Sequence, residues 1–194
     1  MSKSMSEFFD ELSENWDKNE VSSNDERREF LKFLDIKEGN KVLDLACGTG
    51  VITSLLQEKS KTDVIGIDIS PKMIEKAKEK EKNNSFIHYC VGDFVTYNFN
   101  EKFDYIIVFN AYPHFLDRKA FKNQVLSLLN KNGKLAIIHN ISRQQIKNHH
   151  KGCASQYSRE LLSPLEEAQL YLPEMNVLIN EENEHSYKLV LQIK

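Results

Sequence analysis

One stretch of this sequence constrains the fold more than any other: a short apolar strand that runs directly into a glycine-rich turn. Residues 42–47 read Val-Leu-Asp-Leu-Ala-Cys and are followed at once by Gly48, Thr49 and Gly50. Glycines leave no side chain where a ligand must approach the backbone, and the next helix offers free amides to an anionic group. The stretch therefore predicts a cofactor-binding loop. A tight connection without a ligand is the alternative interpretation.

From residue 41 onward, apolar runs rich in Val, Ile and Leu alternate with helical periodicity, which is typical of βαβ units and a mainly parallel sheet. The predicted strands cover residues 41–46, 64–68, 86–91, 103–109, 134–139, 175–179 and 187–193. The polar stretch between the last two runs predicts an antiparallel pair at one edge. With no internal repeat or linker, the sequence predicts one α/β domain over residues 1–194.

Three predicted helices carry start signals. Ser70 and Pro71 form an N-cap followed by a preset first helical residue. Segments 163–166 and 23–26 both place Ser three residues before Glu, the pattern of a capping box. The apolar stripe within residues 121–133 predicts a further helix, ended by the Asn-Gly pair that closes this segment.

Composition narrows the function classes. Twenty-six Lys and Arg against 29 Asp and Glu give a net charge of −3, which offers no broad basic surface for nucleic acid or an anionic membrane. Three cysteines without a C-x-x-C pair suggest neither a disulfide framework nor a zinc ribbon. The N-terminus has no apolar signal-peptide core, and no run of about 18 apolar residues occurs. A cytoplasmic protein with small partners is expected.

Two acidic residues follow later strands. Asp68 ends the second predicted strand, where a carboxylate can accept both hydroxyls of a ribose. Capping of the next helix is the alternative role, although Ser70 is better placed for it. Asp93 follows Gly92 after the third strand and could meet an adenine amino group, or could be a solvated turn residue.

Together, segments 44–50, 67–73, 92–93 and 103–110 resemble the class I S-adenosylmethionine-dependent methyltransferases, in particular small members of the type 11 and type 25 groups. The resemblance covers roughly residues 25–140. It implies a Rossmann-like, doubly wound sheet of order 3-2-1-4-5-7-6, with strand 7 antiparallel and helices on both faces. It also implies S-adenosylmethionine as cofactor and S-adenosylhomocysteine as product. The residues that it places around the cofactor are Asp44, Ala46, Gly48, Gly50, Asp68, Met73, Asp93, Phe94 and Asn110.

The acceptor is expected to be a small molecule. Family members that methylate nucleobase or glutamine amino groups carry Asn or Asp, then Pro-Pro and an aromatic residue after strand 4. This chain has Asn110-Ala-Tyr-Pro-His114 instead. Long insertions for protein or RNA substrates are also missing, so only the N-terminal helices (residues 1–38) and residues 140–174 remain to form an acceptor pocket.

Trp16 belongs to an apolar stripe on the predicted N-terminal helix, together with Phe8, Phe9 and Leu12. Such a stripe is more often packed in a core than exposed. The alternative is a lid that excludes water from the reactive sulfonium, with Trp16 beside the cofactor.

Histidines gather near the predicted carboxyl ends of strands 4 and 5, where open α/β sheets bind ligands. His114 follows strand 4, His139 ends strand 5, and His149 and His150 follow in a short polar helix. A neutral imidazole could take a proton from the acceptor, and His139 and His114 are the catalytic candidates. The predicted acceptor-binding set is His114, His139, Arg143 and His150. Solvated or hydrogen-bonded bystanders are the common fate of single histidines.

Residues His139-Asn-Ile-Ser-Arg143 and the later His150 are also similar to a pattern in some small methyltransferases, which implies an acceptor site without naming its ligand. Two other functions compete. An NAD-linked oxidoreductase would use the acid after strand 2, but Thr53 occupies the third glycine position of its G-x-G-x-x-G turn. A metal- or cofactor-binding module without transfer activity would use His114, His139 and His150 as ligands.

Overall fold

The computed structural model describes residues 3–18 and 22–194, except for the side chains of residues 152–154. Its seven strands follow the order β3-β2-β1-β4-β5-β7-β6, which confirms the predicted Rossmann-like α/β fold. The chain divides into two compact units, Met1–Asn98 and Phe99–Lys194.

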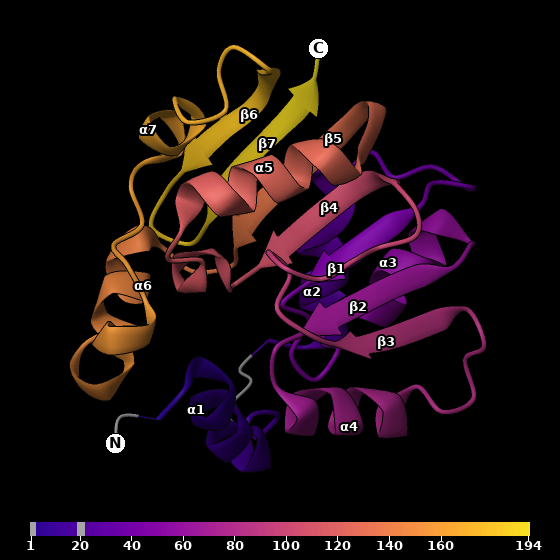
Figure 1. Ribbon diagram of the computed structural model, residues 1–194, viewed down its shortest axis with the longest axis vertical. Coiled ribbons are helices and arrows are strands. Elements are labelled where there is room, and N and C mark those ends of the chain that lie inside the picture. Colours follow the sequence, from indigo (N-terminus) through magenta and orange to yellow (C-terminus); the bar gives the residue numbers. More distant parts are fainter. Residues whose placement is uncertain (1–2, 19–21) are drawn as a thin grey trace. The chain divides into compact units, whose positions relative to one another are not determined.

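The first unit contains three parallel strands and the helices around them (Figure 1). Its elements are α1 (Met5–Leu12), η1 (Ser13–Asn15), α2 (Asn24–Phe30), η2 (Leu31–Phe33), β1 (Val42–Leu45), α3 (Thr53–Ser60), β2 (Val64–Asp68), α4 (Pro71–Lys80) and β3 (Ile87–Val91). All four residues of β1 are buried, as expected for a parallel strand covered on both faces. Helix α1 packs against α4, beside which Figure 1 shows it.

The second unit pairs β4 with β5 in parallel, β5 with β7 antiparallel, and β6 with β7 antiparallel. Its elements are β4 (Phe103–Phe109), η3 (Tyr112–His114), α5 (Arg118–Leu128), β5 (Leu129–His139), α6 (Arg143–His149), η4 (Gly152–Tyr157), α7 (Pro164–Ala168), β6 (Met175–Glu182) and β7 (Tyr187–Ile193). The predicted antiparallel pair at the end of the chain is therefore confirmed. Helix α7 packs against both strands of this pair, β6 and β7 (Figure 1).

The predicted start signals are confirmed at the level of hydrogen bonds. The Ser70 side chain accepts from the Met73 amide at the start of α4, and capping boxes begin both α2 and α7. These bonds satisfy amides that have no partner within the first turn of a helix.

Several predicted boundaries are wrong. Helix α5 ends at Leu128, and β5 already begins at Leu129 rather than at Lys134. The Asn-Gly pair does not end the helix but lies inside β5, where Asn132 has φ 61° and the register against β4 shifts. A bulge thus absorbs the turn residues without ending the strand. Strand β6 runs on to Glu182 because the hairpin continues to pair with β7.

No helix in the described part of the chain is long and apolar enough to cross a membrane. Cys47 and Cys90 are free thiols. The side chain of Cys153, the third cysteine, lies outside the described residues.

Candidate functional site

The loop after β1 departs sharply from ordinary backbone geometry. Ala46, Gly48 and Gly50 all have positive φ angles, of 54°, 54° and 78°. Such a conformation is uncommon for a residue with a side chain, so the alanine stores strain that the surrounding structure must hold. The Cys47 amide donates to the Ile67 carbonyl at 3.0 Å, and this bond ties the loop to the end of β2.

The two glycines of the loop serve different purposes. A Cβ at Gly50 would overlap the Tyr89 hydroxyl, so close packing leaves no room for a side chain at this position. Among the described residues, a Cβ at Gly48 would meet only the Trp16 indole nitrogen, at 3.8 Å. The space in front of Gly48 therefore suits a ligand that lies against the backbone.

Asp44 is buried at the end of β1 and accepts a 2.5 Å hydrogen bond from the Thr53 hydroxyl. Burial is the main cause that raises its pKa to about 7, against the lowering effect of the Thr53 bond. Thr53 thus occupies the position of the third glycine in a G-x-G-x-x-G turn, and its side chain binds Asp44 of β1. A dinucleotide-binding turn needs glycine there for close helix packing, which this chain does not provide.

Asp68 both shapes the loop and presents a carboxylate to it. Its Oδ2 accepts from the Gly48 amide at 2.9 Å and its Oδ1 from the Ser70 amide at 2.8 Å. Burial raises the pKa of this carboxyl, and the two amide bonds oppose the rise. A carboxylate offers about four acceptor sites, so Asp68 can accept a further donor besides these amides.

Two aspartates connect the N-terminal segment to this loop and to the start of α4. Asp17 accepts from the Thr49 hydroxyl at 2.5 Å and pairs with the Lys80 ammonium at 3.1 Å. Asp10 accepts from the Ser70 hydroxyl and from the Lys72 amide at the start of α4.

Trp16 is brought to the loop by these contacts. Its indole lies beside Gly48 and stacks edge-on against Phe9, with ring centroids 6.2 Å apart. Helix α1 buries none of its residues, although the Phe8 and Phe9 rings contact each other edge-on, with centroids 5.3 Å apart.

The remaining residues predicted around the cofactor have other contacts. Met73 and Phe94 are buried, whereas the exposed Asp93 accepts from the Val95 amide at 2.9 Å, as a turn residue does. Asn110, in the second unit, has φ 55° and exchanges hydrogen bonds with Asn140, which joins the ends of β4 and β5.

Three of the predicted histidines come together in the second unit. The rings of His114 and His150 lie 4.9 Å apart in an edge-to-face arrangement. His139 is 1 % exposed, and burial followed by the charges of His114 and His150 lowers its pKa to about 3. Burial, then the charges of His114 and His149, lowers the pKa of His150 to about 4. Burial also lowers the pKa of His114, so these imidazoles are neutral near pH 7.

His114 has a defined tautomer. Its Nδ1 lies 2.8 Å from the Tyr157 carbonyl oxygen, which can only accept a hydrogen bond. Nδ1 must therefore carry the proton, and Nε2 is the basic nitrogen of the neutral ring.

His139 and its neighbour across the sheet contain buried polar atoms without partners. His139 pairs with Tyr187 in the β5–β7 ladder, and the two rings pack at right angles, 5.8 Å apart. Among the described residues, His139 Nε2 and the Tyr187 hydroxyl are buried and unpaired. Such atoms are costly unless a water or ligand satisfies them.

Arg143 pairs with Glu182, to which its Nε and one terminal nitrogen donate at 2.9 and 3.1 Å. The Arg143 charge is thus compensated by the Glu182 carboxylate. Arg143 and His150 also line a groove of about 740 Å³ between α6, residues 158–161 and the tip of the β6–β7 hairpin.

The metal interpretation of the histidines gains no support. Within residues 3–18 and 22–194, the structure holds no group of three or more His, Cys, Asp or Glu side chains that could bind a metal ion.

A buried polar cluster in the second unit was missed by the sequence analysis. It consists of Tyr112, Arg118, Arg159, Glu167 and Tyr171. The only sequence signal nearby is the capping box that starts α7, and it marks Glu166 rather than the buried Glu167.

The strand order is that of the Rossmann-like methyltransferase fold. A family model described as a methyltransferase domain matches residues 36–184. The chain therefore belongs to the methyltransferase domain family. This finding replaces the NAD-linked alternative.

Curated relatives carry different acceptor names. The chain is 34 % identical over 108 residues to demethylmenaquinone methyltransferase of Staphylococcus carnosus, covering 52 % of this chain and 45 % of the relative. It is 33 % identical over 103 residues to malonyl-[acyl-carrier protein] O-methyltransferase 1 of Ilyobacter polytropus, covering 52 % and 38 %. Identity to phosphoethanolamine N-methyltransferase 1 of Arabidopsis thaliana is 32 % over 112 residues, covering 57 % and 23 %. The chain thus spans less than half the length of these relatives.

Solved structures share the fold over nearly the whole chain. A SAM-dependent methyltransferase from Aquifex aeolicus gives a TM-score of 0.74 at 18 % identity, covering 99 % of this chain and 100 % of that one. N-methyltransferase NodS from Bradyrhizobium japonicum, solved with S-adenosylhomocysteine, gives 0.72 at 15 % identity, covering 95 % and 98 %.

Proposed function

We propose that this methyltransferase acts on a small-molecule acceptor whose reacting group is bound by His114, His139 and His150. The observation that carries the proposal is the grouping of three neutral imidazoles from the ends of β4, β5 and α6. The carboxyl ends of parallel strands are where open α/β sheets bind their ligands. The curated relatives, whose names include both O- and N-methyltransferases, leave the acceptor atom open.

Methyl transfer is an in-line displacement for which bound S-adenosylmethionine supplies an activated methyl group. The loop residues Ala46, Gly48 and Gly50 would hold the amino-acid part of the cofactor, and Asp68 its ribose. Asp44, Met73, Phe94, Asp93 and Asn110 belong to the same proposed set. What remains for the protein is orientation, exclusion of water and removal of a proton from the acceptor.

His114 is the better placed of the two proposed bases. Its Nδ1 is committed to the Tyr157 carbonyl, so the lone pair of the neutral ring is on Nε2. His139 lies deeper, and its unpaired Nε2 would bind a polar atom of the acceptor or of a bridging water. Arg143 would contribute to acceptor binding from the groove, in exchange with its partner Glu182.

We extend the proposal to the organisation of the chain, as a single cytoplasmic domain over residues 1–194. Residues 1–38 would act as a lid over the cofactor loop, a role supported by the contacts of Trp16, Asp10 and Asp17. Residues 140–174 would form the acceptor side, supported by the position of His150 next to His114.

The experiment is a panel of small-molecule hydroxyl, thiol and amine acceptors, assayed for release of S-adenosylhomocysteine. With the best acceptor, we expect His114→Gln and His139→Ala each to lower kcat by at least about tenfold. Affinity for S-adenosylhomocysteine should stay unchanged. His185→Gln is the matched control, because His185 is exposed at the β6–β7 turn. Normal turnover in both folded variants would show that His114 and His139 take no part in methyl transfer.

A further inference from the structure

Glu167 is a fully buried carboxylate on the short helix α7. It lies 2.7 Å from a terminal nitrogen of Arg118 and 2.7 Å from one of Arg159. Since an unpaired buried charge is very unfavourable, the two arginines compensate for the burial of this carboxylate.

Neutral donors complete the surroundings of Glu167. The Tyr112 hydroxyl donates to it at 3.3 Å and the Leu162 amide at 3.2 Å. The Tyr171 and Tyr112 hydroxyls lie 3.0 Å apart, and the Arg159 guanidinium stacks over the Tyr112 ring at 4.7 Å. Replacing such a network by apolar residues is often neutral or stabilising in other proteins, so stability alone is a weak reason for it.

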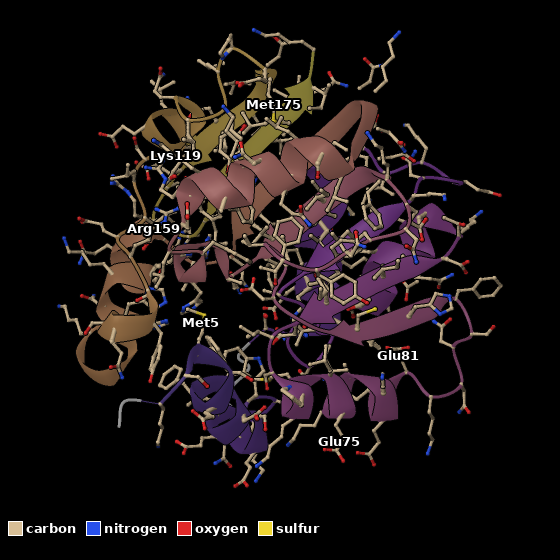
Figure 2. All side chains as sticks on the ribbon, viewed as in Figure 1. Met5, Glu75, Glu81, Lys119, Arg159 and Met175 are labelled. Carbon is tan, nitrogen blue, oxygen red and sulfur yellow. The ribbon has the colours of Figure 1, made fainter. Side chains whose placement is uncertain are left out.

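The network holds the turn that carries His114 from both sides. Arg159, labelled in Figure 2, donates its backbone amide to the Pro113 carbonyl at 2.9 Å and its Nε to the Phe115 carbonyl at 3.2 Å. These are the residues directly before and after His114. The preceding Tyr112 is bonded to Glu167 itself.

The same segment also fixes the His114 ring. Tyr157, two residues before Arg159, provides the carbonyl that accepts from His114 Nδ1. Any movement of Arg159 would therefore displace both the backbone and the hydrogen-bond acceptor on which the tautomer of His114 depends.

We propose that Glu167 is a positioning residue for methyl transfer. Through Arg159 it locks residues 112–115 against segment 157–159, and this keeps His114 in the Nδ1–H tautomer with Nε2 as the base. The inference rests on the proposed role of His114 in proton removal.

The test is nitrogen NMR of the histidine rings at pH 7, with His114 assigned from the spectrum of His114→Gln. In the wild-type protein we expect His114 as the Nδ1–H tautomer. In Glu167→Gln, which keeps the shape but removes the charge, the His114 nitrogens should shift toward those of an unconstrained ring that exchanges between tautomers. Glu174→Gln is the matched control, since Glu174 forms an ion pair with Lys122 at the surface.

A second variant covers the case in which Glu167→Gln does not fold. Arg159→Lys keeps the positive charge but loses the planar fork that reaches both Glu167 and Phe115, and it should shift His114 in the same way. Calorimetric titration with S-adenosylhomocysteine on the same samples should give affinities within about twofold of wild type.

The outcomes separate the two proposals. A wild-type His114 in the Nε2–H form, or His114 signals unchanged in a folded Glu167→Gln or Arg159→Lys protein, would overturn the positioning role. Acceptor turnover that is normal in His114→Gln would instead overturn the proposed catalytic role, while leaving the tautomer result intact.

Discussion

At the scale of single residues, one buried acid connects the loop after β1 with the helix that follows β2. Asp68 holds the glycine loop through the Gly48 amide and the start of α4 through the Ser70 amide. Ser70 in turn is the N-cap of α4. In the proposed cofactor role of Asp68, a carboxylate already oriented by amides would be preorganised for ribose hydroxyls, and preorganisation of this kind lowers the cost of binding.

Replacing Asp68 tests this role directly. We expect Asp68→Ala to weaken S-adenosylhomocysteine binding by about 1.5 to 3 kcal/mol, because the ribose loses a charged acceptor. Calorimetry measures the change, with NAD titrated beside it as a ligand that should not bind. Asp63→Ala is the control, since Asp63 is exposed just before β2. Unchanged affinity in folded Asp68→Ala would remove Asp68 from the cofactor site.

At the scale of elements, the two glycines of the strand–loop–helix unit from β1 to α3 have different surroundings. Gly50 faces the Tyr89 ring, while Gly48 faces open space bounded by the Trp16 indole. Both have positive φ, so any side chain adds backbone strain at either position. The difference between the two positions lies in what a side chain would displace.

Alanine at the two glycines should therefore give different phenotypes. Gly48→Ala is expected to lower the free energy of unfolding by about 1 to 2 kcal/mol through backbone strain alone. Gly50→Ala should lower it further, since Tyr89 must move. Urea denaturation measures both.

Binding completes the comparison of the two glycines. Gly48→Val should abolish S-adenosylhomocysteine binding while circular dichroism shows a retained fold, because the side chain fills the space in front of the loop. Normal cofactor affinity in Gly48→Val would mean that this space is not used by the ligand.

At the scale of the whole molecule, buried ionisable groups make stability depend on pH in two opposing ways. His139 and His150 have pKa values lowered to about 3 and about 4. Below about pH 6.5 these two histidines are protonated in the unfolded chain but remain neutral in the folded one. The free energy of unfolding therefore decreases as the pH falls below about 6.5, and the stability that the neutral histidines provide is fully present only above that pH. Asp44, with its pKa raised to about 7, acts in the opposite sense, and its contribution is lost as the pH rises from about 4 to 7.

Removing one buried histidine isolates its contribution. Between pH 6.5 and 5, wild-type stability relative to His139→Gln should fall by about 2 kcal/mol, at about 1.4 kcal/mol per pH unit. Urea unfolding at several pH values measures this difference. His185→Gln, at the exposed hairpin turn, should keep the wild-type pH dependence. Parallel pH curves for wild type and His139→Gln would contradict a buried neutral imidazole.

The sequence by itself determined most strand segments, the helix starts and the glycine turn after β1, because these depend on local chemistry: runs of β-branched residues, serine caps, and glycines where φ is positive. The strand order was implied by the resemblance to the methyltransferase family and is confirmed. The sequence also placed His114 and His139 at the ends of β4 and β5, since strand direction follows from topology. It misjudged the start of β5, because an Asn-Gly pair fits a bulge as well as a turn.

Only the tertiary structure decided which polar groups meet. Glu167 looks in sequence like its neighbour Glu166, yet one caps a helix at the surface and the other binds two arginines in the interior. The tautomer of His114 depends on a carbonyl 43 residues away along the chain. Contacts of this kind arise from packing between distant segments, and no local pattern of residue types encodes them.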